Sequence, residues 1–126
     1  MMTLIFAAAL GLPMPCPAAR ALDGDTIACS NGVHIRLTGI DAPEMPGHCR
    51  AGRDCAPGDP VKSRDDLAAA LAHHRVTYRP IKTDLYGRTV AMVYAARANL
   101  NCRQLATARY VARWDSGGFV KRECGL

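Results

Sequence analysis

Apolar and polar side chains alternate strictly in one short segment of the first third of the chain. In Val-His-Ile-Arg-Leu-Thr (33–38) every second residue is apolar, so the apolar side chains fall on one face of an extended strand. Asn31-Gly32 separates this segment from the segment Thr-Ile-Ala-Cys (26–29), an arrangement typical of a β-hairpin with a two-residue turn. The pattern predicts a hairpin with one face in the core and the other free for chemistry.

The rest of the chain shows helix, strand and turn signals. The predicted elements are an irregular loop over 43–60, a helix over about 63–74, strands over 75–81 and 89–94 around a turn at 84–87, a helix over about 101–109 and a strand around 110–114. Ser63, with acidic and then apolar residues after it, is the expected cap of the first helix, and Asn101 is the expected cap of the second.

This order of elements predicts an α+β fold. Strands come first, then a helix, more strands and another helix, as in a domain with a curled antiparallel sheet. We expect a five-stranded OB-fold β-barrel with two or three short helices. A chain of 126 residues is too short to bury two separate cores, so it should form a single domain.

The first fifteen residues resemble an export signal. The apolar run 4–12 is too short to span a bilayer and suits the core of a signal peptide. We interpret 1–15 as a signal peptide and 16–126 as the mature domain, and we expect no stable membrane association. The run has no basic residues before it, so a buried first strand and a misassigned start codon remain alternatives. A cut after Ala18 would remove Cys16, so we expect either a cut before Cys16 or no cut.

Six cysteines, none of them in a Cys-x-x-Cys arrangement, predict a disulfide framework. Such a framework indicates an oxidising compartment, so we expect a secreted or periplasmic protein. Six cysteines allow fifteen connectivities. From where the segments should lie in the barrel we prefer the pairs Cys16–Cys29, Cys49–Cys55 and Cys102–Cys124. Reduced thiols remain an alternative for Cys29 and Cys102, which have apolar neighbours.

The charge of the chain is basic. It carries 16 Lys and Arg against 11 Asp and Glu, which gives a formal net charge of +5 and a pI near 9.1. A basic surface attracts polyanions such as nucleic acids through long-range steering. A scattered set of arginines equally favours solubility, so charge alone leaves both interpretations open.

Acids and arginines gather in two stretches, residues 23–44 and residues 84–88. Neither stretch contains a pair of nucleophile and base. With a two-residue turn, Asp25 would face Thr38 and lie diagonal to Arg36 on the same side of the sheet. Asp41 would fall on the opposite face by simple alternation, so a bend at Gly39 is needed to bring it back. The hairpin thus predicts Asp25 and Arg36 as neighbours, with Asp41 close to them.

These residues suit the chemistry of a phosphate diester. Two aspartates and a nearby backbone carbonyl are hard oxygen ligands, which favour Ca²⁺ or Mg²⁺ over zinc. Arg36 and Arg88 could grip the phosphate oxygens while the ion cancels their charge, and Glu44 could orient or deprotonate an attacking water. Taken singly, each residue also fits an ordinary turn, strand or loop, so the hypothesis depends on their combination.

Three blocks of the sequence resemble the signature motifs of the staphylococcal nuclease (thermonuclease) family. They are Leu-Asp-Gly-Asp-Thr-Ile (22–27), Ile-Arg-Leu-Thr-Gly-Ile-Asp-Ala-Pro-Glu (35–44) and Asp-Leu-Tyr-Gly-Arg-Thr-Val-Ala-Met-Val-Tyr (84–94). The resemblance covers most of the chain from about residue 22 to 110. It implies an OB barrel and Ca²⁺-dependent hydrolysis of DNA or RNA.

By motif position, the resemblance makes Asp25 and Asp41 metal ligands. It places the backbone carbonyl of Ala42 beside them and Thr26 near the water shell of the metal. Ala42 stands where the best-known member of the family has a threonine, and this change is harmless if only the carbonyl is used.

The same resemblance makes Arg36, Glu44 and Arg88 the catalytic residues, with Tyr86 contacting the substrate phosphate. Leu85 replaces a lysine that would help to hold phosphate, which affects the expected affinity for substrate. The cysteine-containing loop after Glu44 resembles a bacterial subgroup of the family.

Two other functions remain as alternatives to a sugar-nonspecific nuclease. One is an OB-fold nucleic-acid-binding module that has lost turnover, and the other is a family member acting in polysaccharide metabolism. A module that only binds has no physical reason to keep both metal acids, Asp25 and Asp41, together with Glu44. We therefore expect a monomeric enzyme that acts on DNA and RNA.

Overall fold

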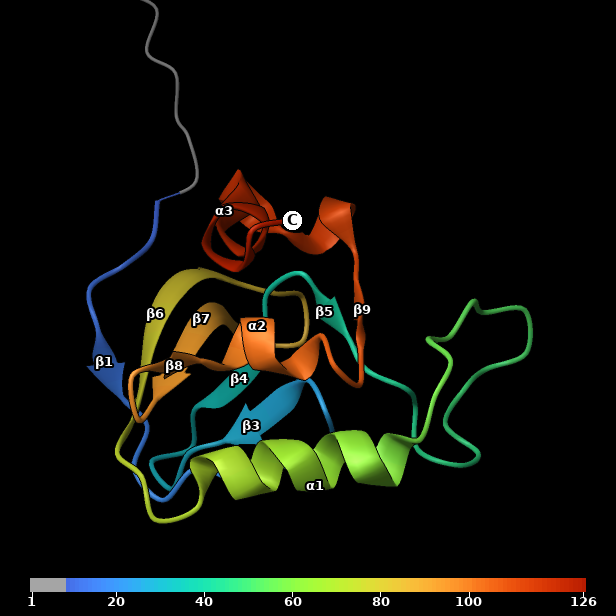
Figure 1. Ribbon diagram of the computed structural model, residues 1–126, viewed down its shortest axis with the longest axis horizontal. Coiled ribbons are helices and arrows are strands. Elements are labelled where there is room, and N and C mark those ends of the chain that lie inside the picture. The colour runs from blue at the N-terminus through green and yellow to red at the C-terminus, as the bar shows by residue number, and fades with distance from the viewer. Residues whose placement is uncertain (1–8) are drawn as a thin grey trace, which may run out of the picture.

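The strands of the protein are mostly short. The computed structural model describes residues 9–126, and its strands are β1 (Met14–Pro15), β2 (Arg20–Ala21), β3 (Thr26–Ala28), β4 (His34–Leu37), β5 (Ile40–Asp41), β6 (Val76–Thr83), β7 (Thr89–Ala95), β8 (Ala98–Asn99) and β9 (Arg109–Tyr110). Seven of them form one curled sheet in the order β1-β6-β7-β4-β3-β2, with β8 paired to β7, while β5 pairs with β9 in a second sheet (Figure 1). The neighbours β4 and β7 run parallel.

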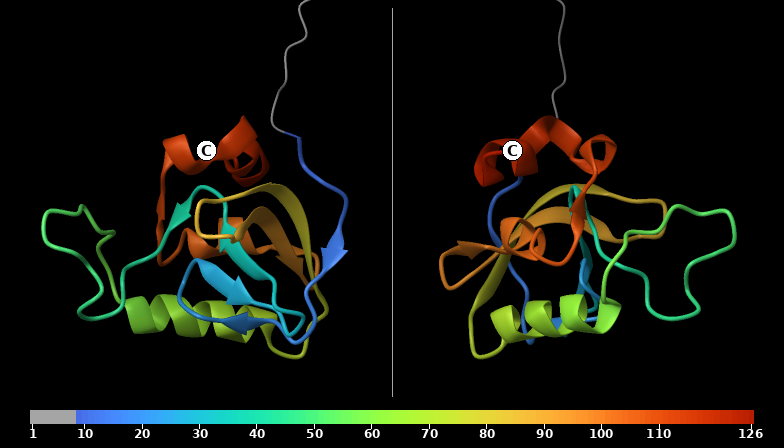
Figure 2. Two further views of the ribbon diagram at one scale, coloured as in Figure 1. Left: turned by 180° about the vertical axis from the view of Figure 1, so that it is seen from behind. Right: turned by 45° about the vertical axis from the view of Figure 1, so that its right-hand side comes forward.

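Helices cover the curled sheet from two sides. They are α1 (Pro60–Leu71), α2 (Leu100–Gln104) and α3 (Phe119–Cys124), with 3₁₀ turns at Ala112–Trp114 and Ser116–Gly118. Figures 1 and 2 show α1 along one side of the sheet and α3 at the opposite side. The predicted α+β, OB-fold-like architecture is confirmed, and two-residue strands at the edges raise the strand number above five. Within the part that the structure describes, no helix is both long and apolar enough to cross a membrane.

The first hairpin has a different register from the one predicted. Thr26 is the Cα partner of Arg36, and the Cys29 amide donates to the Val33 carbonyl at 2.8 Å, so the loop has three residues instead of two. Gly32 has a φ of +91°, a left-handed conformation that glycine adopts without strain and that suits a three-residue loop. As a result, Asp25 lies opposite Leu37 and not Thr38.

Both predicted helices begin earlier than expected. The cap of α1 is Asp59, whose Oδ1 accepts from the Val61 and Lys62 amides at 3.0 and 3.2 Å, and Pro60 occupies the first helical position. Proline is well suited there because its missing N–H would have no helical partner. Ser63, the predicted cap, is instead fully buried within the helix.

The second helix shows a similar correction. Asn99 caps α2 by accepting from the Cys102 amide at 3.0 Å. The predicted cap Asn101 is fully buried, and its side chain donates to the carbonyls of Thr38 and Ala91, both at 3.1 Å, and accepts from the Val93 amide at 2.9 Å. Asn101 therefore fastens α2 to β7 and to the turn that follows β4.

The remaining predictions differ in their outcome. The two central strands and the turn between them match β6, β7 and residues 84–87, and 43–59 is irregular as expected. The predicted last strand shortens to β9 and continues as a 3₁₀ turn. Of the predicted signal peptide, residues 1–8 lie outside the described residues, and Met14–Pro15 form β1 against β6.

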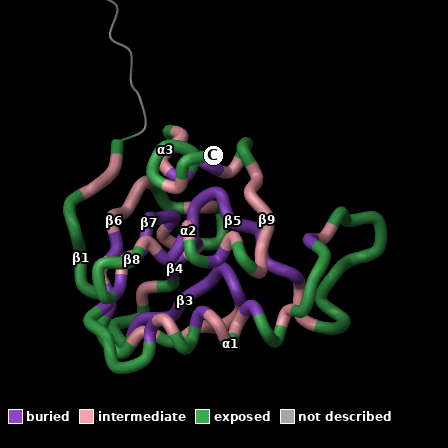
Figure 3. The backbone as a smooth tube through the Cα atoms, viewed as in Figure 1, coloured by how far each residue is buried: buried purple, intermediate pink, exposed green. Residues whose placement is uncertain are grey.

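The core lies inside the curled sheet, and three disulfides join segments around it and in the loop after β5. The largest fully buried apolar side chains come from β3, β4, β5, α1, β7, α2 and α3: Ile27, Ile35, Leu37, Ile40, Leu67, Met92, Val93, Leu100 and Val120. Figure 3 shows this burial concentrated in the strands, whereas the loop after β5 is largely exposed. The three preferred disulfides are confirmed: Cys16–Cys29, Cys49–Cys55 and Cys102–Cys124. The last of them joins α2 to α3.

Candidate functional site

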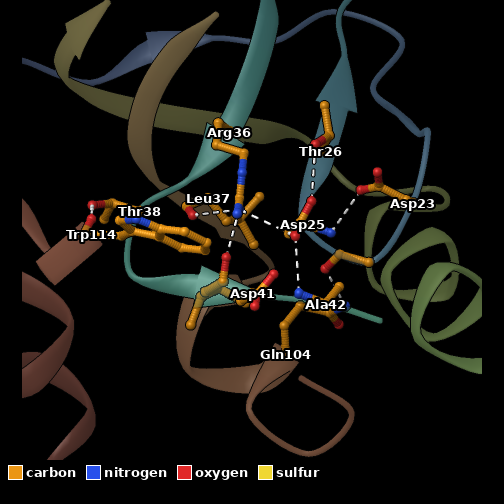
Figure 4. Close-up of polar contacts among 12 residues, drawn as sticks. Asp23, Asp25, Thr26, Arg36, Leu37, Thr38, Asp41, Ala42, Gln104 and Trp114 are labelled. Carbon is orange, nitrogen blue, oxygen red and sulfur yellow. Dashed lines mark hydrogen bonds and ion pairs between the residues drawn. The ribbon is translucent and has the colours of Figure 1, made fainter. Parts of the chain in front are cut away.

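Asp25 is the centre of a polar cluster at the start of β3 (Figure 4). Its Oδ1 accepts from the Thr26 hydroxyl at 3.0 Å, and its Oδ2 accepts from the Ala42 amide at 2.9 Å. The same Oδ2 lies 3.3 Å from Nη1 of Arg36. Burial raises the pKa of Asp25 to about 6, although the Arg36 guanidinium opposes the rise and nearby Asp23 adds to it. The fold therefore holds a carboxylate where its negative charge is only partly compensated.

Arg36 is fixed by the bend that follows β4. Its Nη1 donates to the carbonyls of Leu37 at 3.2 Å and Ile40 at 2.5 Å, in addition to the ion pair with Asp25. The guanidinium carbon lies 5.7 Å from the centre of the Trp114 ring. Among residues 9–126, Nε and Nη2 of Arg36 have no protein acceptor, so these N–H groups can donate to a ligand.

Asp41 reaches the cluster through the predicted bend. Gly39 has a φ of +70°, and a Cβ there would lie 3.2 Å from side-chain atoms of Asp115 and Val120, so glycine is needed on both counts. Asp41 is buried, and its Oδ2 accepts from Nε of Arg109 at 3.0 Å. Asp41 directly precedes Ala42, whose amide donates to Oδ2 of Asp25 at 2.9 Å, so the chain leads Asp41 to the Asp25 cluster (Figure 4).

The donor set of this cluster fits a hard cation. Two carboxylates, Asp25 and Asp41, lie beside the Ala42 backbone, and Thr26 orients the first of them. Calcium prefers such oxygen donors. Burial raises the pKa of Asp25 because it removes water from the charged carboxylate, and a bound cation would stabilise that charged form. In the described part of the chain, no three His, Cys, Asp or Glu side chains are grouped to hold a metal, so water and substrate would have to complete the shell.

Glu44 lies just beyond this cluster, at the start of the irregular loop. Its Oε1 is 3.2 Å from Nη2 of Arg53, and its side chain is one quarter exposed. The described residues show no ion pair between Glu44 and Arg36 or Arg88. Glu44 is thus near the predicted ligands in sequence and is held by a loop residue.

Arg88 and Tyr86 lie on the turn between β6 and β7. Oδ1 of Asp84 accepts from the Tyr86 and Arg88 amides, both at 2.9 Å, and its Oδ2 pairs with Nε of Arg88 at 2.7 Å. Burial acts to raise the pKa of Asp84, but the bonds from Arg88 and Tyr86 outweigh it and lower the pKa. The Arg88 guanidinium also lies 5.4 Å from the Tyr86 ring, which is exposed.

The sheet places Arg36, on β4, beside the strand β7 that directly follows Arg88. Arg36 is the Cα partner of Val90 in the parallel pair, and Arg88 precedes Val90 by two residues, about 7 Å along a strand. A shallow pocket of about 400 Å³ is lined by residues of the two adjacent turns, including His34, Tyr86 and Arg88. In the region described, no hydrogen bond or ion pair joins the side chain of Arg88 to Asp25, Asp41 or Glu44.

Sequence reasoning missed three residues that hold the site. Asp84 precedes Arg88 by four residues, a spacing that could have drawn attention to it. Arg53 and Arg109 gave no such signal, because Arg109 is separated from Asp41 by 68 positions and Arg53 lies in an irregular loop. Their contacts arise only from the tertiary fold.

Comparisons with known proteins point to one family. The family model described as "Staphylococcal nuclease homologue" matches residues 34–109, more than half of the chain. "Probable endonuclease LCL3" of Paracoccidioides lutzii is 43% identical over 65 residues, which are 52% of this chain and 18% of that protein. "Probable endonuclease LCL3" of Ajellomyces dermatitidis is 40% identical over 94 residues, 75% of this chain and 24% of that protein. The chain thus spans about a quarter or less of the length of these relatives.

Proposed function

Because the chain belongs to the staphylococcal nuclease homologue family, we propose that it is a calcium-dependent phosphodiesterase that hydrolyses DNA and RNA. The observation that carries this proposal is the arrangement around Asp25. One buried carboxylate contacts an arginine at 3.3 Å and the Ala42 amide at 2.9 Å, with Asp41 beside it. A cation and a guanidinium can thus meet the same phosphate.

Each part of the site has a role in this reaction. A bound calcium ion would neutralise phosphate charge and polarise the P–O bond, and Asp25, Asp41 and the Ala42 carbonyl would hold it. Arg36 would donate its free N–H groups to a phosphate oxygen. Preorganised donors of this kind stabilise the negative charge that develops during attack, because their orientation is already set.

Residues at the edge of the cluster would complete the chemistry. Glu44 would accept a proton from the attacking water, a task that needs a carboxylate within hydrogen-bond reach of it. Arg88 would grip a second phosphate oxygen, and Tyr86 would contact the phosphate from the exposed turn. These contacts go to phosphate and not to the sugar, which supports action on both DNA and RNA.

The remaining features agree with this proposal. The net charge of +5 favours attraction of a polyanionic substrate. Three disulfides suit an oxidising compartment, so we propose a secreted or periplasmic location. We propose that the protein acts as a monomer, because the proposed chemistry requires no residue from a second chain.

The direct test is cleavage of labelled single-stranded DNA and labelled RNA in calcium and in excess chelator. We expect both to be cut in calcium and neither in chelator. Glu44→Gln should slow cleavage by about 10²-fold or more, the usual contribution of a positioned general base, with the fold unchanged. Asp65→Asn is the matched control, because Asp65 is an exposed acid on α1, and it should cut normally.

Two results would count against the proposal, the first against cleavage itself and the second against the role of Glu44. Binding of DNA without cleavage under any divalent ion would indicate a module that only binds. Equal cleavage by Glu44→Gln and the unaltered chain would remove Glu44 from the reaction.

A further inference from the structure

Arg109 connects a predicted metal ligand to a loop that sequence reasoning left without a role. In the β5–β9 pair, Arg109 is the Cα partner of Asp41. Its Nε donates to Oδ2 of Asp41 at 3.0 Å, and its Nη2 donates to the backbone carbonyl of Asp54 at 2.8 Å. Its Nη1 also lies 3.4 Å from Oδ2 of Asp54. One guanidinium therefore spans two segments.

The contact with Arg109 restricts the orientation of the Asp41 carboxylate. The side chain of Asp41 is 5% exposed, and the guanidinium occupies its Oδ2. Oδ1 has no protein hydrogen bond among the described residues, so it can ligate a cation. Loss of a residue that hydrogen-bonds to a metal ligand typically weakens metal binding by about 10- to 100-fold, because that residue fixes the orientation of the ligand.

The contact with Asp54 is held in place by a disulfide. Asp54 directly precedes Cys55, and the bridge Cys49–Cys55 closes a short segment of an otherwise irregular and exposed loop. Arg53 of the same segment pairs with Glu44 at 3.2 Å. The closed segment thus contacts the site in two places, at Glu44 through Arg53 and at Asp41 through Arg109.

We propose that Arg109 is a positioning residue that holds Asp41 in the orientation that ligates calcium, and that the Cys49–Cys55 loop acts on the metal site through Arg109. This inference rests on the proposed calcium-dependent function. The ion pair Arg109–Asp41 fixes one carboxylate oxygen, and the Asp54 carbonyl fixes the guanidinium in turn. In this proposal the Cys49–Cys55 loop helps to position a metal ligand, in addition to connecting β5 to α1.

The first test is calorimetric titration of the protein with calcium alone, in the absence of nucleic acid. Arg109→Ala should raise the calcium Kd by about 10-fold or more. Arg109→Lys, which can still donate to Asp41 but cannot also reach Asp54, should give an intermediate Kd. Arg64→Ala is the matched control, because Arg64 pairs with an exposed acid on α1, and its Kd should be unchanged.

Thermal unfolding in chelator separates this effect from loss of the fold. If Arg109→Ala does not fold, the comparison of Arg109→Lys with the unaltered chain decides the matter. A calcium Kd that is unchanged or lower in the folded Arg109 variants would overturn the inference, since a lower Kd would mean that the guanidinium competes with the ion.

The second test asks whether the loop acts through Arg109. Replacing both Cys49 and Cys55 by serine should raise the calcium Kd in the unaltered background. The same replacement should have no further effect in Arg109→Ala, because the link is already broken. If the serine replacements raise the calcium Kd equally in the unaltered chain and in Arg109→Ala, the loop does not act through Arg109 and this part of the inference is overturned.

These titrations separate the inference from the proposed function. A chain that binds calcium through Arg109-supported Asp41 but cuts no nucleic acid would reject the nuclease proposal alone. A chain that cuts nucleic acid in calcium but whose Arg109 variants bind calcium normally would reject the inference alone. A chain that binds no calcium would reject the inference whatever it cuts.

Discussion

Asp25 is a residue whose ionisation the fold makes less favourable. Burial outweighs the nearby guanidinium of Arg36, and the pKa of the carboxyl rises to about 6 from an ordinary value near 3.8. The folded chain therefore binds more protons than the unfolded chain between these two pH values. Linkage then requires the free energy of unfolding to fall as pH rises through this window.

We predict this fall for the calcium-free protein between about pH 4 and pH 6. It should amount to at most about 3 kcal/mol, because one pKa unit corresponds to about 1.4 kcal/mol. Asp25→Asn should flatten the dependence, since an amide does not titrate. Urea unfolding of both chains in chelator at a series of pH values measures it, and parallel curves for the two would exclude Asp25 as the cause.

The site residues differ in how far the sequence could predict them. Asp25, Arg36 and Asp41 come from a hairpin and the bend after it, so local patterns predicted that they meet, although the predicted register between Asp25 and Arg36 was wrong by one position. The partners Arg53 and Arg109 could not be predicted, because their contacts depend on how a loop and a late strand return to β5.

At the scale of elements, local propensity predicted the type of each element better than its register or its cap. The Asn-Gly pair correctly indicated a hairpin, but the left-handed Gly32 closes a three-residue loop and shifts the pairing by one position. Ser63 fits a capping pattern, yet Asp59 and Pro60 precede it and form a stronger start. In the hairpin, Gly32 suits a three-residue loop as well as a two-residue turn. In the helix, Asp59 is of a residue type that caps helices, as Ser63 is, and it comes earlier in the chain.

Asn101 is the polar link between α2 and the strands that carry the site. Its three hydrogen bonds satisfy buried backbone groups of Thr38, Ala91 and Val93. In Asn101→Ala the Thr38 carbonyl and the Val93 amide would lose this partner, whereas the Ala91 carbonyl would keep the Thr38 amide at 3.1 Å. At roughly 1–3 kcal/mol for each buried group left unpaired, we predict a loss of about 2 kcal/mol or more of unfolding free energy. Asn31→Ala, at an exposed loop, should cost less than about 1 kcal/mol. Denaturant unfolding measures both, and similar losses would contradict the role of Asn101.

At the scale of the whole molecule, calcium should stabilise the folded chain by mass action. Calcium at 100 times its Kd would add about 2.7 kcal/mol, because it binds the folded state and not the unfolded state. We predict a Tm several degrees higher in excess calcium than in chelator. Asp41→Asn keeps an oxygen for Arg109 but removes a charged ligand, so its Tm should respond weakly. Differential scanning calorimetry would detect this, and an equal response in both chains would place the ion elsewhere.

The β5–β9 pair joins positions 41 and 109, and β4 joins β7 across the whole of α1 and β6. During synthesis the acidic half of the cluster leaves the ribosome long before the strands that complete it. A nascent chain therefore has no assembled pocket until its last third has emerged. Such distant pairings also carry a large entropic cost of closure, which slows folding relative to a chain of local contacts.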